Sequence, residues 1–115
     1  NHEVLYNAVK SFLSKNPNVD GIFTTGGGVV GAARAVKDLN LIGKTKIVCF
    51  DFDKEIFNLI KEGIIYSAIG QDPFGQGHDP LIYLYNYLAA NVKPESDVIW
   101  TRTDIVDMHN VDDLI

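Results

Sequence analysis

Hydrophobic and polar residues alternate along this chain in blocks that predict an α/β domain. Apolar residues recur at helical spacing over residues 2–15, and a proline in the following turn, residues 16–18, ends that pattern. A run rich in β-branched and aromatic residues at 19–25 predicts a strand, and helical spacing returns at 28–40. The nearly all-apolar run at 46–51 predicts a second strand, one that is buried on both faces.

The alternation continues past the second strand. Asp53 is expected to cap a helix that ends near Gly63, and residues 65–69 predict a third strand. The stretch 20–53 reads by itself as strand, glycine-rich turn, helix and strand. This is the order of a βαβ unit, in which the strands are parallel and the crossover is right-handed.

The last third of the chain is less regular. The helix at 81–91 is apolar nearly all round, and it begins either at Pro73 or at Pro80. Residues 98–100 predict a fourth strand, and 101–115 form an acid-rich, extended tail. The apolar anchors expected in that tail are Ile105, Val106 and Val111. The whole pattern predicts an α/β domain with about four parallel strands.

Composition and charge narrow the classes of function. With 115 residues, of which 46% are hydrophobic and 22% charged, the chain has the balance of one small globular domain or part of a larger one. Its net charge of −5 and its scattered basic residues argue against direct binding to nucleic acid. No apolar run reaches the length of a membrane span, so direct membrane contact is not expected either.

Residues that carry enzyme chemistry do not group in this sequence. The histidines lie far apart without metal-ligand spacing, and the single cysteine, Cys49, is expected to be a buried, inert thiol inside the second strand. His78, beside Asp79, is interpreted as a surface or capping residue. Neither a P-loop nor a nucleophile elbow is present. We therefore expect no enzyme activity, no metal and no cofactor.

Polar residues follow three of the predicted strands at the point where each strand ends. They are Thr25, Gly26 and Gly27 after the first strand, Asp51 and Phe52 after the second, and Gln71 after the third. In parallel sheets ligands gather at the carboxyl ends of strands. The glycine turn offers backbone N–H donors, Asp51 accepts, and Gln71 both donates and accepts. This set predicts a site for a neutral ligand rich in hydroxyl groups.

Neighbouring aromatic and acidic residues have other expected roles. Phe52 or Phe74 would cover the apolar face of a sugar-like ring. Asp53 and Asp72 stand where helices begin, so both are expected to be N-caps rather than ligand contacts. A capping role remains the alternative for Asp51 as well.

The same residues allow a second interpretation. Residues 26–31 satisfy the spacing GxGxxG between a strand and a helix, and Asp51 follows twenty residues after Gly31. In a dinucleotide-binding domain these positions hold the pyrophosphate and a ribose hydroxyl. Two observations argue against this hypothesis. The strand before the glycines follows a full helix, so it is not the first strand of the fold. A nucleotide also does not need the third polar group, Gln71, at the end of the third strand.

Longer stretches of the chain resemble a known family. Residues 20–41, with GAARAVKDLNL, and 46–77, with KIVCFDFDKEIFNLIKEGIIYSAIGQDPFGQG, are similar to the ligand-binding fold shared by ribose-type periplasmic sugar-binding proteins and lac-repressor-type regulators. Phe50 and Asp51 match the family's "FD" motif, and Gln71 with Pro73 matches its "Gln-x-Pro" motif. The resemblance implies a non-enzymatic protein in which Asp51 and Gln71 contact a sugar.

One motif departs from the family pattern. Where the family has an Asn-Asp pair, this chain has Gly26 and Gly27, and the loop to Gly31 is one residue shorter. A side-chain contact with the ligand is therefore lost here or replaced by backbone N–H groups.

The resemblance also implies a fold and a division of the chain. It implies the parallel-sheet, three-layer α/β/α lobe of a type I periplasmic-binding-protein fold. Residues 1–100 would form most of the C-terminal lobe, incomplete at its start, and 101–115 a tail that runs toward a missing lobe. The ligand would close between the two lobes.

Proteins with this fold serve different functions in different cellular locations. A solute-binding protein for uptake or chemoreception would be extracytoplasmic, periplasmic or a cell-surface lipoprotein, with a membrane transporter as partner. The sensor domain of a transcription regulator would be cytoplasmic and would contact DNA through a missing N-terminal domain. The sequence of the tail at 101–115 favours an exported binding protein over a regulator. A third hypothesis is an interaction module that forms a homodimer through the tyrosine-rich helix at 81–91 and the open sheet edge.

Overall fold

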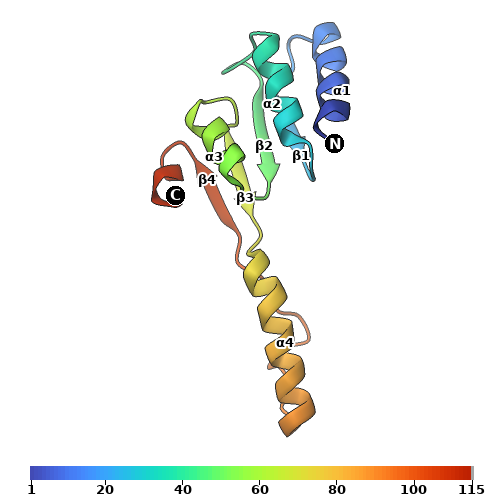
Figure 1. The fold of residues 1–115 in the computed structure, drawn as a ribbon, viewed down its shortest axis with the longest axis vertical. Coiled ribbons are helices and arrows are strands. Elements are labelled where there is room, and N and C mark those ends of the chain that lie inside the picture. Colours follow the sequence, from blue (N-terminus) through green and yellow to red (C-terminus); the bar gives the residue numbers. More distant parts are fainter. Residues whose placement is uncertain (115) are drawn as a thin grey trace. The chain divides into compact units, whose positions relative to one another are not determined.

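The computed structural model describes residues 1–114, which form helices and one short β-sheet (Figure 1). In chain order the elements are α1 (His2–Lys15), β1 (Gly21–Thr24), α2 (Val29–Asp38), β2 (Lys46–Phe50), α3 (Lys54–Lys61), β3 (Ser67–Gly70), α4 (Pro73–Ala90), β4 (Asp104–Asp107) and the 3-10 helix η1 (Val111–Leu114). The described residues divide into two compact units, one of residues 1–70 with the segment from 105 onward, the other of 71–104.

The four strands form one sheet in the order β1-β2-β3-β4. β1 and β3 both pair with β2 in parallel, and the register places Thr24 beside Cys49 and Phe50 beside Ile69. β4 runs in the opposite direction along β3 (Figure 1). The predicted α/β fold is confirmed as a four-stranded, mostly parallel sheet with flanking helices. The fourth strand departs from the predicted parallel arrangement, because it runs opposite to β3 (Figure 1).

The core of the first unit lies between the sheet and its helices. Alternate residues of β2, Ile47 and Cys49, are fully buried, and they pack in one cluster with Ala32 and Val36 of α2 and Ile60 of α3. The intervening residues of β2 are only half-buried, so the strand is not covered on both faces as its apolar sequence predicted.

Most elements lie where the apolar pattern placed them. The helix over residues 2–15 has the predicted bounds, and the helix capped by Asp53 ends at Lys61, with Glu62 as its C-cap and Gly63 in the left-handed region at φ 71°. The predicted strand at 98–100 is wrong, because the fourth strand lies at Asp104–Asp107 instead. Short apolar runs mark strands poorly when no turn signal bounds them.

The C-terminal tail contributes to the core of the first unit. Two of its predicted anchors, Val106 and Val111, are fully buried within the main hydrophobic cluster. The third, Ile105, remains 64% exposed, because it alternates with Val106 along β4 and faces the other side of the sheet. Lys61 of α3 pairs with Asp112 of η1, which joins the tail to the helical layer.

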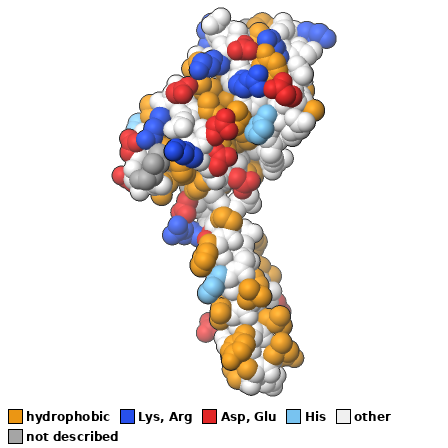
Figure 2. Space-filling view, in the orientation of Figure 1, with side chains coloured by type: hydrophobic (Ala, Val, Ile, Leu, Met, Phe, Trp, Pro, Cys, Tyr) orange, Lys and Arg blue, Asp and Glu red, His pale blue; other side chains and the backbone are white. Residues whose placement is uncertain are grey.

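The second unit consists of α4 and the segment that follows it. α4 begins at Pro73 and continues through Pro80 inside the helix. Many of its apolar side chains are exposed, and Figure 2 shows hydrophobic surface along α4 on the face in view; Leu81 and Leu88 are more than half exposed. Within residues 1–114 no helix combines the length and apolar character that crossing a membrane requires.

α1 and α2 approach each other closely at Gly31. A Cβ atom at this position would overlap the carbonyl oxygen of His2 in α1. Polar contacts complete the same helix pair, since the Tyr6 hydroxyl donates to Asp38 over 2.7 Å and Arg34 pairs with Glu3 over 2.6 Å. The hydrogen bond from Tyr6, together with nearby Lys10, holds the pKa of Asp38 below its ordinary value.

The contact at Gly31 can be tested by adding a single methyl group. Gly31→Ala is expected to lower the free energy of unfolding by about 1–3 kcal/mol, because the helices must separate to admit the Cβ. Urea denaturation followed by circular dichroism measures this change. Gly27→Ala is the matched control: a Cβ there meets no atom within 4 Å, and stability should change by less than about 0.5 kcal/mol. Equal midpoints for the two variants would contradict the packing argument.

Candidate ligand-binding site

The carboxyl ends of β1 and β2 bring five of the predicted site residues to one edge of the first unit. Thr24 pairs with Cys49, so the residues after Thr24 and those after Phe50 leave the sheet at the same edge. Thr25, Gly26, Gly27 and Asp51 are exposed there, and Phe52 is half-buried. In open parallel sheets, ligands bind outside the carboxyl ends of the strands, which is where these residues lie.

The glycine turn leaves open space where side chains would stand. A Cβ atom at Gly26 or Gly27 would meet nothing within 4 Å. Gly28, at φ 107°, is the N-cap of α2 and gives that helix no side-chain hydrogen bond. The first N–H groups of a helix have no partner within the helix, so a cap without a side chain leaves them to other acceptors.

Asp51 is held in position through its backbone. Its N–H group donates to the carbonyl oxygen of Ile69 over 2.9 Å, which extends the pairing of β2 with β3 by one residue. Its φ of 71° lies in the left-handed region, where aspartate and asparagine are tolerated better than most residues. The conformation turns the chain away from the sheet and toward α3.

Phe52 packs onto the end of β3. Its ring lies 5.5 Å from the ring of Phe57, and a Cβ at Gly70 would overlap it. Glycine at position 70 therefore makes room for the aromatic ring. Phe74, the other aromatic candidate, lies in the second unit, where it is 77% exposed and stacks on His78.

Asp53 and Asp72 both act as helix caps, as predicted. The carboxylate of Asp53 accepts from the N–H of Ile56 over 2.7 Å, and that of Asp72 accepts from the N–H of Gly75 over 3.1 Å. His78, at the surface, contacts Asp79 over 2.8 Å.

Gln71 opens the second unit and is described with it. It follows Gly70, the last residue of β3, and is half-buried. Its backbone carbonyl accepts a hydrogen bond from the side chain of Gln76. Sequence order places Gln71 directly after the end of β3, as predicted.

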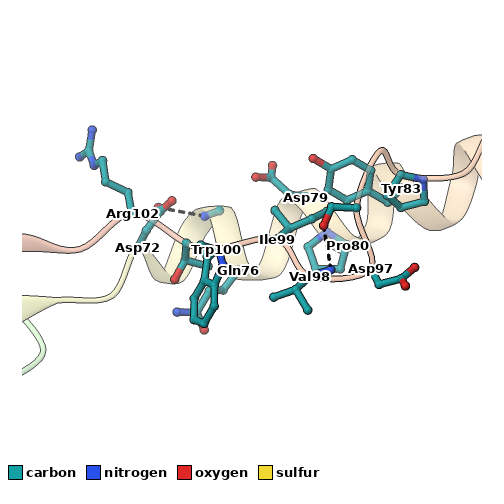
Figure 3. Close-up of a pocket in the computed structure, with 14 residues that line it drawn as sticks. Asp72, Gln76, Asp79, Pro80, Tyr83, Asp97, Val98, Ile99, Trp100 and Arg102 are labelled. Atoms are coloured by element: carbon teal, nitrogen blue, oxygen red, sulfur yellow. Dashed lines mark hydrogen bonds between the residues drawn. The ribbon is translucent and has the colours of Figure 1, made fainter.

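A separate hollow lies within the second unit, between α4 and the segment that follows it (Figure 3). Asp79, Pro80 and Tyr83 line it from α4, and Val98 and Trp100 from the returning segment. None of the six predicted site residues takes part in it. The hollow is therefore not the site that the sequence pattern predicted.

The structure adds one residue that sequence reasoning missed. Thr24, the last residue of β1, is only 8% exposed, and its hydroxyl oxygen has no hydrogen-bond partner. Thr45, the other buried threonine, donates to the carbonyl of Val19 over 2.8 Å. Thr24 closes β1 and Thr45 directly precedes β2, but the sequence alone does not show which of the two hydroxyls finds an acceptor.

Cys49 lies fully buried beneath the same edge. Burial, together with the nearby carboxylates of Asp51 and Asp53, raises the pKa of its thiol to about 11. Among residues 1–114, His, Cys, Asp and Glu side chains form no group of three that could hold a metal ion.

Comparison with known proteins shows which family and which solved structures this chain is similar to. The pattern of the periplasmic binding protein domain matches residues 1–91. The structure is similar to that of an arabinose-binding protein from Geobacillus stearothermophilus, with 28% identity, a TM-score of 0.82, and coverage of 100% of this chain and 42% of that one. A sugar-binding protein of a sugar ABC transporter from Bacillus halodurans has 30% identity and a TM-score of 0.79, with coverage of 94% and 40%.

A glucose–galactose-binding protein from Geobacillus stearothermophilus shares the fold with a TM-score of 0.85 at 22% identity. This chain spans 39% of that protein's length, and 96% of the chain is covered. A comparison with curated protein sequences gave no significant match. These findings do not favour the dinucleotide hypothesis, and Gly31 of the GxGxxG spacing serves the packing of α2 on α1 instead.

The burial of Cys49 predicts its reactivity. Raising the thiol pKa from 9.0 to about 11 lowers the reactive thiolate fraction at pH 8 about a hundredfold. Iodoacetamide should therefore label the native protein far more slowly than the urea-unfolded protein, with a rate that rises as the pH approaches 11. Mass spectrometry of timed samples measures both rates. Similar rates in the native and unfolded states at pH 8 would contradict the buried position.

Proposed function

Because the chain belongs to the periplasmic binding protein domain family, we propose that it binds a small sugar or sugar-like ligand without chemical conversion. In this proposal the chain forms most of a C-terminal lobe, and the ligand lies at the carboxyl ends of β1, β2 and β3. The relatives at 28% and 30% identity are themselves sugar-binding proteins by name. Their matched regions cover about two fifths of each protein, so the remainder of a two-lobe cleft lies outside this chain.

The observation that carries the proposal is the edge formed by β1 and β2. A sugar hydroxyl needs one acceptor and one donor. Asp51, an exposed residue, supplies a carboxylate acceptor, and the exposed turn at Gly26 and Gly27 supplies backbone N–H groups. Phe52, fixed against Phe57, lies next to Asp51 in the chain and offers an apolar surface. Gln71 follows the third strand and would add a group that both donates and accepts.

We place the protein in solute uptake outside the cytoplasmic membrane, delivering its ligand to a membrane transporter. One relative belongs to a sugar ABC transporter, and the matching family is that of periplasmic binding proteins. A sensor domain of a regulator would share the site and differ in what is attached to it.

The proposal predicts that Asp51 is needed for sugar binding. Titration of the ¹⁵N-labelled chain with arabinose, galactose and glucose should shift the backbone amide signals of Gly26, Gly27 and Asp51 at millimolar concentrations. Asp51→Asn keeps a residue that tolerates positive φ but removes the charge. Losing a charged hydrogen bond of about 1.5–3 kcal/mol should weaken binding about tenfold or more.

Asp53→Asn is the matched control for this titration. It removes the same charge two residues away, while asparagine still caps α3. Its sugar affinity should equal that of the unaltered chain. Equal weakening by both substitutions would show a general charge effect, and signal shifts with NAD but with no sugar would support the dinucleotide hypothesis instead.

A further inference from the structure

The start of α2 combines three features that point to one kind of ligand group. α2, a helix of 10 residues, is capped by Gly28 without a side-chain hydrogen bond. The turn before it is open at Gly26 and Gly27. The hydroxyl of Thr24, buried at the end of β1, has no partner. A buried hydroxyl left unpaired costs free energy, so each such group in a protein calls for an explanation.

Thr24 faces the helical layer beneath the turn that leads into α2. Its register partner Cys49 is fully buried in the cluster that contains Val29 and Ala32 of α2. Register partners in a parallel pair point to the same face of the sheet, so Thr24 points to the face that α2 covers. Only four residues separate Thr24 from Val29, the first residue of α2.

We propose that this corner, formed by the Thr24 hydroxyl and the backbone N–H groups from Gly26 to Val29, binds a carboxylate on the ligand, so that the ligand is a sugar acid. This inference rests on the proposed sugar-binding function and specifies its substrate class. Helix N-termini that follow glycine-rich turns favour negative groups, because their N–H groups and the helix dipole both point at the ligand.

The partner for the other end of such a ligand is Asp51. It stands at the end of the neighbouring strand and accepts hydrogen bonds, whereas the start of α2 donates them. A uronic acid matches this polarity, since its hydroxyl groups can donate to Asp51 while its carboxylate faces α2. The width of the sugar ring keeps the two negative charges apart.

The open space at the turn accommodates this group. In a uronic acid the carboxylate takes the place of the CH2OH group of the neutral sugar, and a Cβ atom built at Gly26 or Gly27 meets nothing within 4 Å, so no neighbouring side chain crowds these positions. A longer side chain at either position would fill the space that the carboxylate needs.

Matched sugars and matched threonine variants test the inference. Galactose and galacturonate, and glucose and glucuronate, differ only at the carbon that carries the carboxylate. Each is titrated into the ¹⁵N-labelled chain, into Thr24→Val and into Thr45→Val. Valine has nearly the shape of threonine without the hydroxyl. Thermal unfolding of each variant without sugar is measured in parallel.

The expected result separates the two threonines. At least one uronic acid should bind about tenfold more tightly than its neutral partner and shift the amide signals from Gly26 to Val29. Thr24→Val should abolish this preference without lowering the unfolding temperature, because it removes no existing hydrogen bond. Thr45→Val should lower the unfolding temperature, because the carbonyl of Val19 loses its donor, and should keep the preference.

Two results would overturn the inference in distinguishable ways. Neutral sugars that bind as tightly as their acids, or a preference that survives in Thr24→Val, would refute the carboxylate corner while leaving sugar binding intact. No signal shift with any sugar or sugar acid would refute the proposed function together with the inference.

Discussion

Parallel pairing of β2 with both β1 and β3 is the constraint on which this structure depends. Because the three strands run in one direction, the segments that leave β1 and β2 meet at one edge, and the helices return along the buried face. Ile47 and Cys49, fully buried on β2, anchor that register. A shift by one residue would turn these two side chains away from the helices and expose them. The position of Asp51 beside the glycine turn follows from the same register.

The close approach of α1 and α2 adds a second constraint near the same edge. Gly31 admits the backbone of α1, and Gly28 lies against Leu5 of that helix. α2 is thus fixed from its first turn, which limits where its N–H groups point. Two of the glycines in the GxGxxG spacing serve this helix packing. A motif that resembles a nucleotide fingerprint therefore arises here from a packing requirement.

Much of the fold can be predicted from the sequence, because the helices show clear apolar periodicity and begin at residues whose chemistry suits a cap. Helical spacing correctly predicts the bounds of α1, and the places of Asp53 and Asp72 before helices correctly predict their capping roles. The predicted strand at 98–100 is wrong, since a short apolar run has no periodicity that distinguishes a strand from a loop. The strand at Asp104–Asp107 has acidic ends and offers little hydrophobic signal.

The candidate site was predictable at the level of strand ends but not of individual atoms. Sequence order alone places Thr25, Asp51 and Gln71 after strands. It does not reveal that Asp51 adopts a positive φ or that Phe52 leans on Gly70, because both depend on contacts between strands. The sequence also does not reveal that the Thr24 hydroxyl is buried without a hydrogen-bond partner. This depends on which face of the sheet the hydroxyl occupies and which acceptors lie within reach. A buried hydroxyl without a partner calls for an explanation, and the proposed contact with a ligand carboxylate supplies one.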